Sequence, residues 1–573
     1  MTITMNKLSE AKRMRRAAAM VGPIVVVCFA CGPRRLENGP EYDYVLRNGL
    51  VVDGSGGAPY RGDVATKGDR IAVVGTVDGH GREELDVRGQ AITPGFVNML
   101  SWATESLIAD GRGLSDLAQG VTVEIFGEGS SMGPLNDRMK AEMTKSQVDI
   151  HYAITWTTLR EYLEMLQHKG ITLNVGSFVG AATVRDYVVG QDNRVATAEE
   201  LAQMRALVRR AMADGAFGVG AALIYVPGTF ATTDELVELS REAAAAGGMY
   251  IAHIRNEGTR LLAAVDETID ISRRAGIRAE IYHFKAGGKP AWPLLPDAIA
   301  RIEQARAAGV SISANMYTYP AAATGLDAVM PPWVREGGED KWFARLKDPA
   351  IRARVAKEMN ELTDAWDNMW VGTGPDGILL VSFKNPALKK YTGKRLSDVA
   401  KELGKSPEET AMDLVVEDQT RVGAIYFSQS EDNVRKVVAL PWVSFGSDEG
   451  AEEPEGVFLM SKPHPRAYGN IARLFARYVR DEHRVTLQEA VRRAAALPAA
   501  NLKLDHRGTL RAGNFADVVV LDPATIQDHA TFDQPQQLAT GVAHVFVNGV
   551  PEIRNGSYTG AKAGRALYGP GMR

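Results

Sequence analysis

The chain has 573 residues, of which 45% are hydrophobic and 24% are charged, as in an ordinary globular protein of two or three domains or one elaborated barrel. Its 66 basic and 70 acidic residues give a net charge of −4, which offers no electrostatic case for binding nucleic acid. The two cysteines, Cys28 and Cys31, both lie near the N-terminus, so disulfides and thiolate nucleophiles are excluded from the rest of the chain.

Residues 1–41 are predicted to be a leader followed by a tether. The basic run 12–16 precedes an apolar run, 17–30, which is too short to favour a membrane-spanning helix and is typical of a secretory signal. Its end, Phe29-Ala30-Cys31, resembles a bacterial lipobox, in which the cysteine is lipidated. We expect an exported protein, either a lipid-anchored lipoprotein or a periplasmic protein. An uncleaved N-terminal anchor is the remaining alternative.

Short β hairpins are predicted at both ends of the remaining chain. In residues 42–75 strand-like runs alternate with glycine-containing turns, and the same pattern returns in residues 516–549. All-β segments that flank a long region of alternating strands and helices suggest one domain assembled from both termini. We therefore predict a small β-sandwich formed by residues 42–93 and 500–573.

Between these ends, apolar strand candidates alternate with helical segments, which is typical of a (β/α)8 barrel. The clearest candidates are Val121–Phe126, Asn174–Val179, Ala216–Ala221, Tyr250–His253, Arg278–His283, Ser311–Asn315 and Val443–Gly446. The predicted fold class is α/β, a TIM-like barrel over residues 94–499 with the β-sandwich built from both chain ends. The alternation of strands and helices stops at about 325–420, and we predict that this segment is a lid-like insertion over the barrel mouth.

Two of these strands end in a histidine. His253 and His283 each follow an apolar run, and the segment 259–276 between them has the apolar periodicity of a helix. Side chains at the carboxyl ends of parallel barrel strands share one mouth, so both histidines can approach one metal ion. A single histidine at a strand end is a hydrogen-bonded core residue as often as it is a metal ligand. Two histidines at equivalent strand ends favour metal binding. Arg255 and Glu257 are expected to pair near the mouth, with no catalytic role.

Several segments, in chain order, are similar to the N-acyl-D-amino-acid deacylases (D-aminoacylases). They are Leu223–Gly228, His253–Gly258, His283–Lys285, Gly446–Asp448 and His464–Gly469. In addition, Ile92–Asn98 resembles the opening barrel strand of the amidohydrolase superfamily, to which those deacylases belong. The likeness runs from about Tyr42 to Tyr558, and it implies a (β/α)8 barrel with a β-sandwich and a zinc ion in the barrel mouth.

The resemblance also implies roles for individual residues. His253 and His283 match metal ligands, and Asp448 matches the aspartate that takes a proton from water at the metal. Zinc on neutral histidines lowers the pKa of its water to about 7, and an aspartate nearby can accept that proton and return it to the leaving amine. From the residues alone, Asp448 could instead be a helix N-cap or part of a structural salt bridge.

Three further residues match the family's substrate-binding groups. Lys285 and Arg466 correspond to cations that bind the substrate carboxylate, and Tyr317 corresponds to the tyrosine after the seventh strand, with Tyr319 close behind. An arginine can hold a carboxylate bidentately. The alternatives are a bridge from Lys285 to a neighbouring acid and a solvent-facing loop position for Arg466.

The sequence departs from the family pattern at its metal ligands. The first strand of the superfamily usually ends in His-x-His, where this chain has Leu100 and Trp102, and neither side chain can bind a metal. A histidine that is common after the fourth strand is Ala181 here. Glu128 lies at or next to the place of the family's cysteine ligand. Glu124, four residues before it, is taken as structural but is the alternative carboxylate ligand. Two histidines, one glutamate and water would form a standard hydrolytic zinc site, so we predict about one Zn²⁺ per chain held by Glu128, His253 and His283.

The predicted function is zinc-dependent hydrolysis of the amide bond of N-acyl amino acids or similar peptide-like amides that carry a carboxylate. The D configuration follows from the resemblance only. One alternative is a catalytically silent barrel that binds a ligand or acts as an envelope scaffold, which the loss of the first-strand histidines motivates. Another is the hydrolysis of a cyclic imide or a lactone. No nucleic acid is expected as a partner, and membrane contact is expected only through the N-terminal anchor.

Overall fold

The computed structural model describes residues 41–572, which belong to the second of two compact units of the chain, residues 40–573. The predicted signal and lipid anchor lie outside the described residues. Within the described part, none of the helices combines the length and the apolar character that crossing a membrane requires.

Parallel strands form the centre of the fold. The residues of β7 to β11 are buried throughout, as expected for parallel strands covered by helices on one side and by side chains inside a barrel on the other. The strands are β6 (Phe96–Asn98), β7 (Val121–Phe126), β8 (Asn174–Ser177), β9 (Val179–Gly180), β10 (Gly218–Ala222), β11 (Met249–His253), β12 (Arg278–Ile281), β13 (Ile312–Met316) and β17 (Val443–Phe445). With β8 and β9 counted as one interrupted strand, these are eight parallel strands, and the predicted barrel is confirmed.

The barrel closes between its first and last strands. The backbone N–H of Met99 donates to Phe445 O over 3.2 Å, and that of Asp448 donates to Leu100 O over 2.8 Å. Ser101 and Glu449 form a further parallel bridge. Residues that follow β6 and β17 therefore meet at the same end of the barrel, although about 350 positions separate them in the chain.

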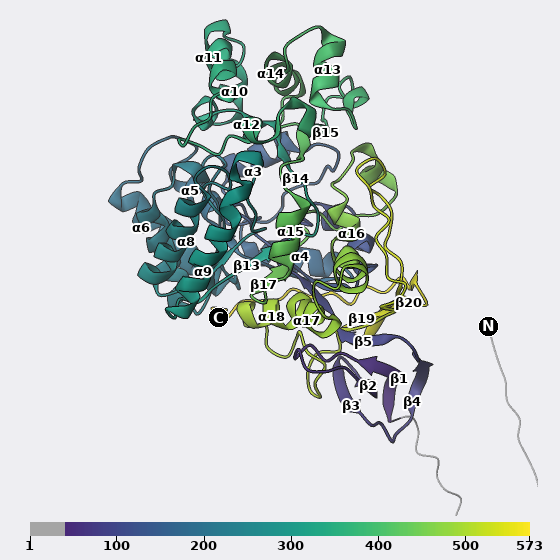
Figure 1. The fold of residues 1–573 in the computed structure, drawn as a ribbon. Coiled ribbons are helices and arrows are strands. Elements are labelled where there is room, and N and C mark those ends of the chain that lie inside the picture. The colour runs from purple at the N-terminus through teal and green to yellow at the C-terminus, as the bar shows by residue number, and fades with distance from the viewer. Residues whose placement is uncertain (1–40, 573) are drawn as a thin grey trace, which may run out of the picture. The chain divides into compact units, whose positions relative to one another are not determined.

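Helices surround the barrel, and α6, α8 and α9 lie in a row on one side of it (Figure 1). The segment predicted as a helix at 259–276 is α8, which ends where Gly276 adopts a left-handed φ of 63°. The longer helices around the barrel are α3 (Asp137–Ser146), α4 (Leu159–Lys169), α5 (Ala181–Val188), α6 (Ala198–Ala213), α7 (Thr233–Ala245), α8 (Leu261–Ala275), α9 (Leu295–Ala307), α15 (Glu431–Val438) and α16 (Arg466–Arg473). Shorter ones are α1 (Ser106–Ala109), α2 (Leu114–Leu117), α17 (Leu487–Val491) and α18 (Leu497–Leu502).

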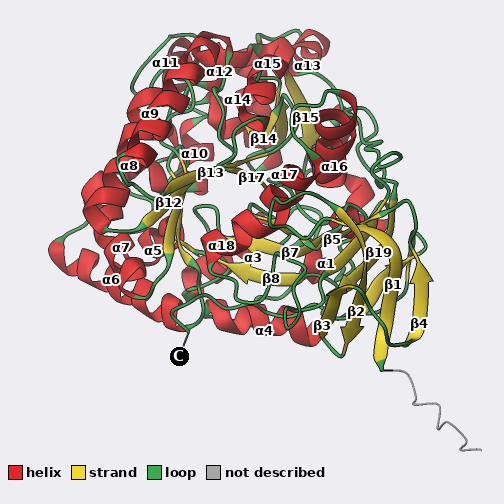
Figure 2. Cartoon of the chain, turned by 60° about the horizontal axis from the view of Figure 1, so that its bottom comes forward, coloured by secondary structure: helices red, strands yellow, loops and turns green. Residues whose placement is uncertain are grey.

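Strands from both chain ends form one further sheet of nine strands, seen at the lower right of Figure 2. The strands are β1 (Tyr42–Val51), β2 (Tyr60–Lys67), β3 (Arg70–Gly75), β4 (Gly81–Asp86), β5 (Ala91–Pro94), β18 (Val518–Leu521), β19 (Val542–Val547), β20 (Val550–Arg554) and β21 (Ser557–Tyr558). β5 pairs antiparallel with β18, which joins the two ends as predicted. Val45 and Leu46, which point to opposite faces of β1, belong to two different apolar clusters, so both faces of this sheet are covered.

The segment predicted as the opening barrel strand, 92–98, is divided between the two sheets. Its first part is β5 of the end sheet, and only β6 belongs to the barrel. Gly95 lies at the junction, and a Cβ there would lie 2.2 Å from Oγ1 of Thr122. The chain crosses between the sheets at a point with no room for a side chain, which the apolar character of the segment did not reveal.

The insertion has its own apolar core, which includes Leu326, Trp342, Leu380 and Met412. Its strands form a three-stranded antiparallel sheet, so the element extends a few residues beyond the predicted limits of 325 and 420. Its elements are β14 (Ala322–Gly325), α10 (Glu339–Arg345), α11 (Pro349–Met359), α12 (Met369–Thr373), β15 (Ile378–Ser382), α13 (Leu396–Leu403), α14 (Pro407–Asp418) and β16 (Gly423–Tyr426). In Figure 1 these helices lie above the barrel, at the end away from β1 to β4.

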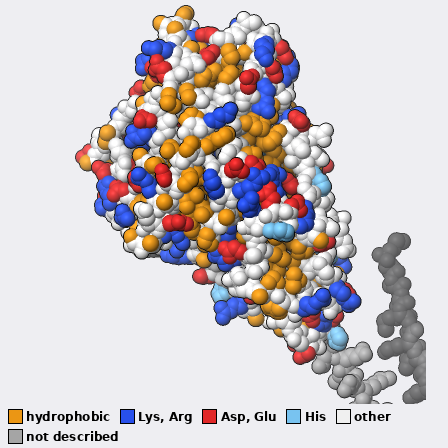
Figure 3. Space-filling model, viewed as in Figure 1, with side chains coloured by type: hydrophobic (Ala, Val, Ile, Leu, Met, Phe, Trp, Pro, Cys, Tyr) orange, Lys and Arg blue, Asp and Glu red, His pale blue; other side chains and the backbone are white. Residues whose placement is uncertain are grey.

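Charged side chains of both signs are mixed over the face of the protein drawn in Figure 3, with a dense group near α15 and α16. In that region Arg435 pairs with Glu482, and Arg477 pairs with both Glu482 and Glu431. These arginines are therefore balanced by neighbouring carboxylates rather than forming a field of one sign.

Candidate metal centre

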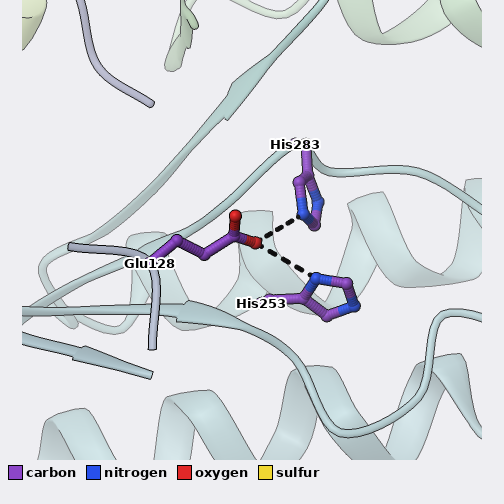
Figure 4. Close-up of side chains that lie close together, drawn as sticks. All are labelled: Glu128, His253 and His283. Atoms are coloured by element: carbon purple, nitrogen blue, oxygen red, sulfur yellow. Dashed lines mark hydrogen bonds and ion pairs between the residues drawn. The ribbon is translucent and has the colours of Figure 1, made fainter. Parts of the chain in front are cut away.

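Glu128, His253 and His283 come together at the mouth of the barrel (Figure 4). Oε1 of Glu128 lies 3.1 Å from Nδ1 of His253 and 2.9 Å from Nε2 of His283. The three side chains are buried, and their ligand atoms all lie within 4.8 Å of one another. Of the described residues, this is the one group of histidines, cysteines and acids that meets the geometry of a metal site.

The barrel explains this convergence. His253 ends β11, His283 follows β12 and Glu128 follows β7, so all three stand at the carboxyl ends of parallel strands. Between Phe126 and Glu128 the chain turns at Gly127, whose φ is 107° and where a Cβ would lie 2.5 Å from the backbone O of Phe178. A glycine is therefore needed to direct Glu128 into the mouth.

His283 and Asp448 have left-handed φ angles of 33° and 54°, which are uncommon for residues other than glycine. Each is held by a hydrogen bond from its backbone N–H, to Oδ1 of Asn315 for His283 and to Leu100 O for Asp448, both over 2.8 Å. Unusual backbone conformations that the surroundings enforce are frequent at functional sites.

Electrostatic forces favour a charged carboxylate at Glu128. Burial opposes its ionisation, but His283 and His253 outweigh burial and hold the pKa of Glu128 well below its usual range. Burial likewise opposes a charge on His283, yet Glu257 and Glu128 raise the pKa of His283 to about 9. The negative charge of Glu128 is therefore available to a metal cation, and metal binding would compete with protonation of His283.

Glu257 and Lys285 lie behind the two histidines. Nζ of Lys285 donates to Oε1 of Glu257 over 2.6 Å and lies 2.8 Å from Nδ1 of His283. The carboxylate of Glu257 also lies 3.1 Å from Nδ1 of His283 and 3.8 Å from Nε2 of His253. The expected pair of Arg255 and Glu257 is wrong, because Arg255 pairs with Glu267 instead. The bridge from Lys285 to a neighbouring acid, weighed as an alternative, is present.

Asp448 and Arg466 are paired on the other side of the mouth. Nη2 of Arg466 lies 2.8 Å from Oδ2 of Asp448, and the guanidinium lies 4.2 Å from the centre of the Tyr317 ring. Arg466 is only 1% exposed, so the alternative of a solvent-facing arginine is wrong. Its Nε and Nη1 are buried and make no hydrogen bond with the described residues. Tyr319 instead bonds to Asp528, which leaves Tyr317 as the tyrosine near the centre.

Trp102 is expected from the sequence only as an apolar group near the mouth, but the structure shows it as a hydrogen-bond donor within the site. Its indole N–H lies 3.0 Å from Oε2 of Glu128 and 3.1 Å from Oδ1 of Asp448, and the side chain is 41% exposed at the mouth. The available signal was the position of Trp102, because the family has the second histidine of its first-strand His-x-His motif there. Leu100, at the place of the first histidine, is buried in the apolar interior.

Glu124, the other carboxylate considered as a ligand, lies outside the centre. Its Oε2 accepts a hydrogen bond of 2.9 Å from Nδ2 of Asn98, which also donates to Ser447. Burial raises the pKa of Glu124 to about 8, against the effect of its hydrogen bonds. Glu128 is therefore the carboxylate that the fold brings to the two histidines.

A cavity of about 100 Å³ lies beside Tyr225, and none of the three ligand residues lines it. Tyr225 lines it and packs edge-on against His253, with 5.4 Å between the ring centres. Asp327 and Asp367, from the insertion, line the same cavity, and Asp367 accepts a hydrogen bond of 2.7 Å from the backbone of Glu257. The insertion thus contributes directly to the walls of the barrel mouth.

Comparison with known proteins identifies the family. The profile described as the amidohydrolase family matches residues 151–551. The chain belongs to the amidohydrolase family. A D-aminoacylase of Alcaligenes xylosoxydans xylosoxydans is 32% identical over 528 residues, which are 92% of this chain and 97% of that relative.

Two solved structures have the same fold. A crystal structure of D-aminoacylase is 30% identical and superimposes with a TM-score of 0.76 over 92% of this chain and 100% of the other. An N-acyl-D-glutamate deacylase from Bordetella bronchiseptica, complexed with zinc and a phosphonate inhibitor, is 28% identical, with a TM-score of 0.75 over 92% of this chain and 99% of that one.

These relatives confirm the prediction of a metal-dependent hydrolase that acts on amide C–N bonds. The amidohydrolase family thus provides a reaction class for the group formed by Glu128, His253 and His283.

Proposed function

We propose that this amidohydrolase uses one zinc ion, held by Glu128, His253 and His283, to hydrolyse N-acyl-D-amino acids. The observation that carries the proposal is the meeting of these three ligands with Asp448 at one barrel mouth. Ligand atoms about 2.0 to 2.1 Å from a tetrahedral zinc lie roughly 3.3 to 3.4 Å apart. The distances of 3.1 and 2.9 Å from Glu128 to the two histidine nitrogens fit this spacing within a few tenths of an ångström.

The metal and the substrate class have independent support. Two imidazoles and a carboxylate that leave a position for water are a frequent ligand set of catalytic zinc. When bound, zinc would polarise the amide carbonyl and acidify water at the site. The B. bronchiseptica deacylase, of similar structure, is complexed with zinc, and further relatives are named N-acyl-D-aspartate and N-acyl-D-glutamate deacylases. All three names specify an N-acyl amino acid of D configuration.

Asp448 is the group proposed to move the proton. Burial raises its pKa, which the paired Arg466 opposes and the nearby Glu128 reinforces. A carboxylate with a raised pKa is a stronger base near neutral pH. Asp448 accepts a proton from the attacking water and transfers it to the amine nitrogen as the C–N bond breaks. The products are a carboxylic acid and a free amino acid.

Arg466 is proposed to bind the substrate carboxylate. The Nη1 atom is buried without a hydrogen-bond partner among the described residues, and Nε has only an ion pair with Glu449 over 3.6 Å, so a substrate carboxylate would supply the missing acceptor. Tyr317 packs against this guanidinium and orients it. For Lys285 the role in substrate binding remains a prediction, because Glu257 already accepts a hydrogen bond from its ammonium group.

The test is amine release from N-acetyl-D- and N-acetyl-L-amino acids by zinc-loaded protein, with a cyclic imide as a further substrate. We expect turnover of the D forms that requires zinc, and a loss of about 100- to 10,000-fold in kcat for Asp448→Asn. The control is Asp432→Asn, at an exposed position on α15 that pairs with Arg435, and we expect it to leave the rate unchanged. Zinc-independent turnover, or equal rates for Asp448→Asn and the parent, would contradict the proposal.

A further inference from the structure

One neutral hydrogen-bond donor connects the metal-binding side of the mouth with the side that moves the proton. The indole Nε1 of Trp102 lies 3.0 Å from Oε2 of Glu128 and 3.1 Å from Oδ1 of Asp448. The remaining carboxylate oxygens have other partners: Oε1 of Glu128 contacts both histidines, and Oδ2 of Asp448 contacts Arg466. Trp102 is therefore the hydrogen-bond donor to the two remaining carboxylate oxygens, Oε2 of Glu128 and Oδ1 of Asp448.

Hydrogen bonds hold the backbone of Trp102 in place. Ser101 N–H donates to Ile125 O over 3.0 Å, on the strand that leads to Glu128. Trp102 N–H donates to Glu449 O over 2.9 Å, next to Asp448. Trp102 is thus tied to both of the elements whose carboxylates its ring connects.

The chemistry of indole decides what this position can bind. The five-membered ring of tryptophan is attached in the same way as imidazole, so its Nε1 occupies the place that Nε2 of a histidine would take. The indole nitrogen, however, is only a donor, whereas a neutral histidine offers a lone pair to a metal. The N–H is therefore compatible with two carboxylates and incompatible with a cation between them.

We propose that Trp102 limits the centre to a single metal ion by donating its indole N–H to the two carboxylate oxygens that a second ion would need. The inference rests on the proposed metal-dependent function and adds to it the residue that sets the metal count. Glu128 Oε2 and Asp448 Oδ1 are the open carboxylate ligands for a second ion, and a histidine at position 102 would supply the nitrogen that completes such a site.

The test is the metal count of Trp102→His. Apo-protein of the parent and the variant is dialysed to equilibrium against increasing zinc, and bound zinc is measured by elemental analysis. We expect the parent to saturate at about one ion per chain and the variant to reach about two in a second, weaker step. In the manganese-loaded variant, electron paramagnetic resonance should show a spin-coupled pair, because both ions share Glu128.

The matched control is Trp333→His. Trp333 also donates its indole N–H to a carboxylate, Oε2 of Glu358 over 2.7 Å, but it lies in the insertion. This variant should still bind about one ion without spin coupling, because position 333 lies outside the one metal-ligating group found among residues 41–572. A second ion in the parent, coupled to the first, would overturn the inference even if Trp102→His did not fold. A folded Trp102→His with one ion would also overturn it, whereas a parent that binds no metal would refute the proposed function itself.

Discussion

Two glutamates four positions apart show how their surroundings determine what they do. Glu128 is held as a charged carboxylate by two histidines, whereas burial beside Asn98 raises the pKa of Glu124 to about 8. At neutral pH, Glu124 is therefore mostly a neutral hydrogen-bonding acid. A glutamine copies the shape of that neutral acid but cannot replace a charged metal ligand.

We therefore predict opposite effects of the same substitution at these two positions. Glu128→Gln should weaken zinc binding by at least about 100-fold, because it removes the anionic ligand. Glu124→Gln should bind zinc as the parent does, and it serves as the control. Competition with a fluorescent chelator measures both affinities. Equal losses in the two variants would show that Glu128 has no special place in the centre.

Arg466→Lys tests the carboxylate-binding role. Lysine keeps the positive charge but loses the planar pair of donors, so kcat/KM for N-acyl amino acids should fall by about 10- to 100-fold, mainly through KM. The same substitution at Arg138, which forms surface pairs with Glu142 and Asp186, should leave the kinetics unchanged. A normal KM for Arg466→Lys would place the substrate carboxylate elsewhere, with Lys285 as the next residue to test.

Residue types at strand ends were sufficient to bring His253 and His283 together, and the family resemblance added Glu128 to them. Residue types and resemblance were insufficient for Trp102 and Glu257, whose contributions depend on orientation. Trp102 acts through a single N–H that points at two carboxylates distant in the chain, and Glu257 reaches His283 from four positions beyond His253. Such contacts depend on how the strands are arranged around the barrel, which periodicity does not encode.

At the scale of elements, apolar runs identified most barrel strands to within two or three residues, because parallel strands are buried on both faces and read as continuous hydrophobic segments. Apolar character did not predict the strands correctly at residues 92–98, which form two strands of different sheets. Both β5 and β6 are buried there, so hydrophobicity alone could not separate a strand of the end sheet from a barrel strand. Pairing partners distinguish them: β5 pairs with β1 and with β18, which is more than 400 residues away, whereas β6 pairs with β7.

The insertion depends on a buried charge cluster. Asp327 accepts a 2.7 Å hydrogen bond from Nε of Arg421 and also pairs with the buried Arg335. Asp327→Asn would leave two neighbouring guanidinium groups without their counter-charge, so we expect a loss of about 3–5 kcal/mol in the stability of the insertion.

Thermal unfolding and limited proteolysis within residues 322–426 measure this effect. Asp340→Asn is the matched control, because Asp340 is 77% exposed in its pair with Lys145 and should contribute less than about 1 kcal/mol. If Asp327→Asn resists protease as well as the control does, the charge cluster does not stabilise the insertion.

For the molecule as a whole, several buried carboxyl groups make stability depend on pH. Burial raises the pKa of Glu449, Glu453 and Glu552 to about 7 in each case, above the value of 4.5 for an ordinary glutamate. Between about pH 4.5 and 7 the folded chain keeps protons that the unfolded chain releases. The stability that these groups contribute is therefore fully present below about pH 4.5 and is lost as the pH rises through 7.

We predict that the free energy of unfolding of the metal-free protein falls between about pH 4.5 and 7, because these glutamates release their protons near pH 4.5 when unfolded but only near pH 7 when folded. Glu552→Gln should reduce this slope and raise stability at about pH 8 by roughly 1–3 kcal/mol, since the neutral amide is not deprotonated. The exposed Glu142→Gln is the control. Urea denaturation from about pH 4.5 to 8 measures both variants, and stability that increases as the pH rises to about 7 would be contrary to expectation.

The most direct measurement is X-ray diffraction at the zinc absorption edge from crystals of the zinc-loaded protein. We expect one strong anomalous peak, in contact with Oε1 of Glu128, Nδ1 of His253 and Nε2 of His283, and no second peak beside Trp102. The absence of a peak among these three side chains, or a zinc ion bound by other residues of the barrel mouth, would contradict this expectation.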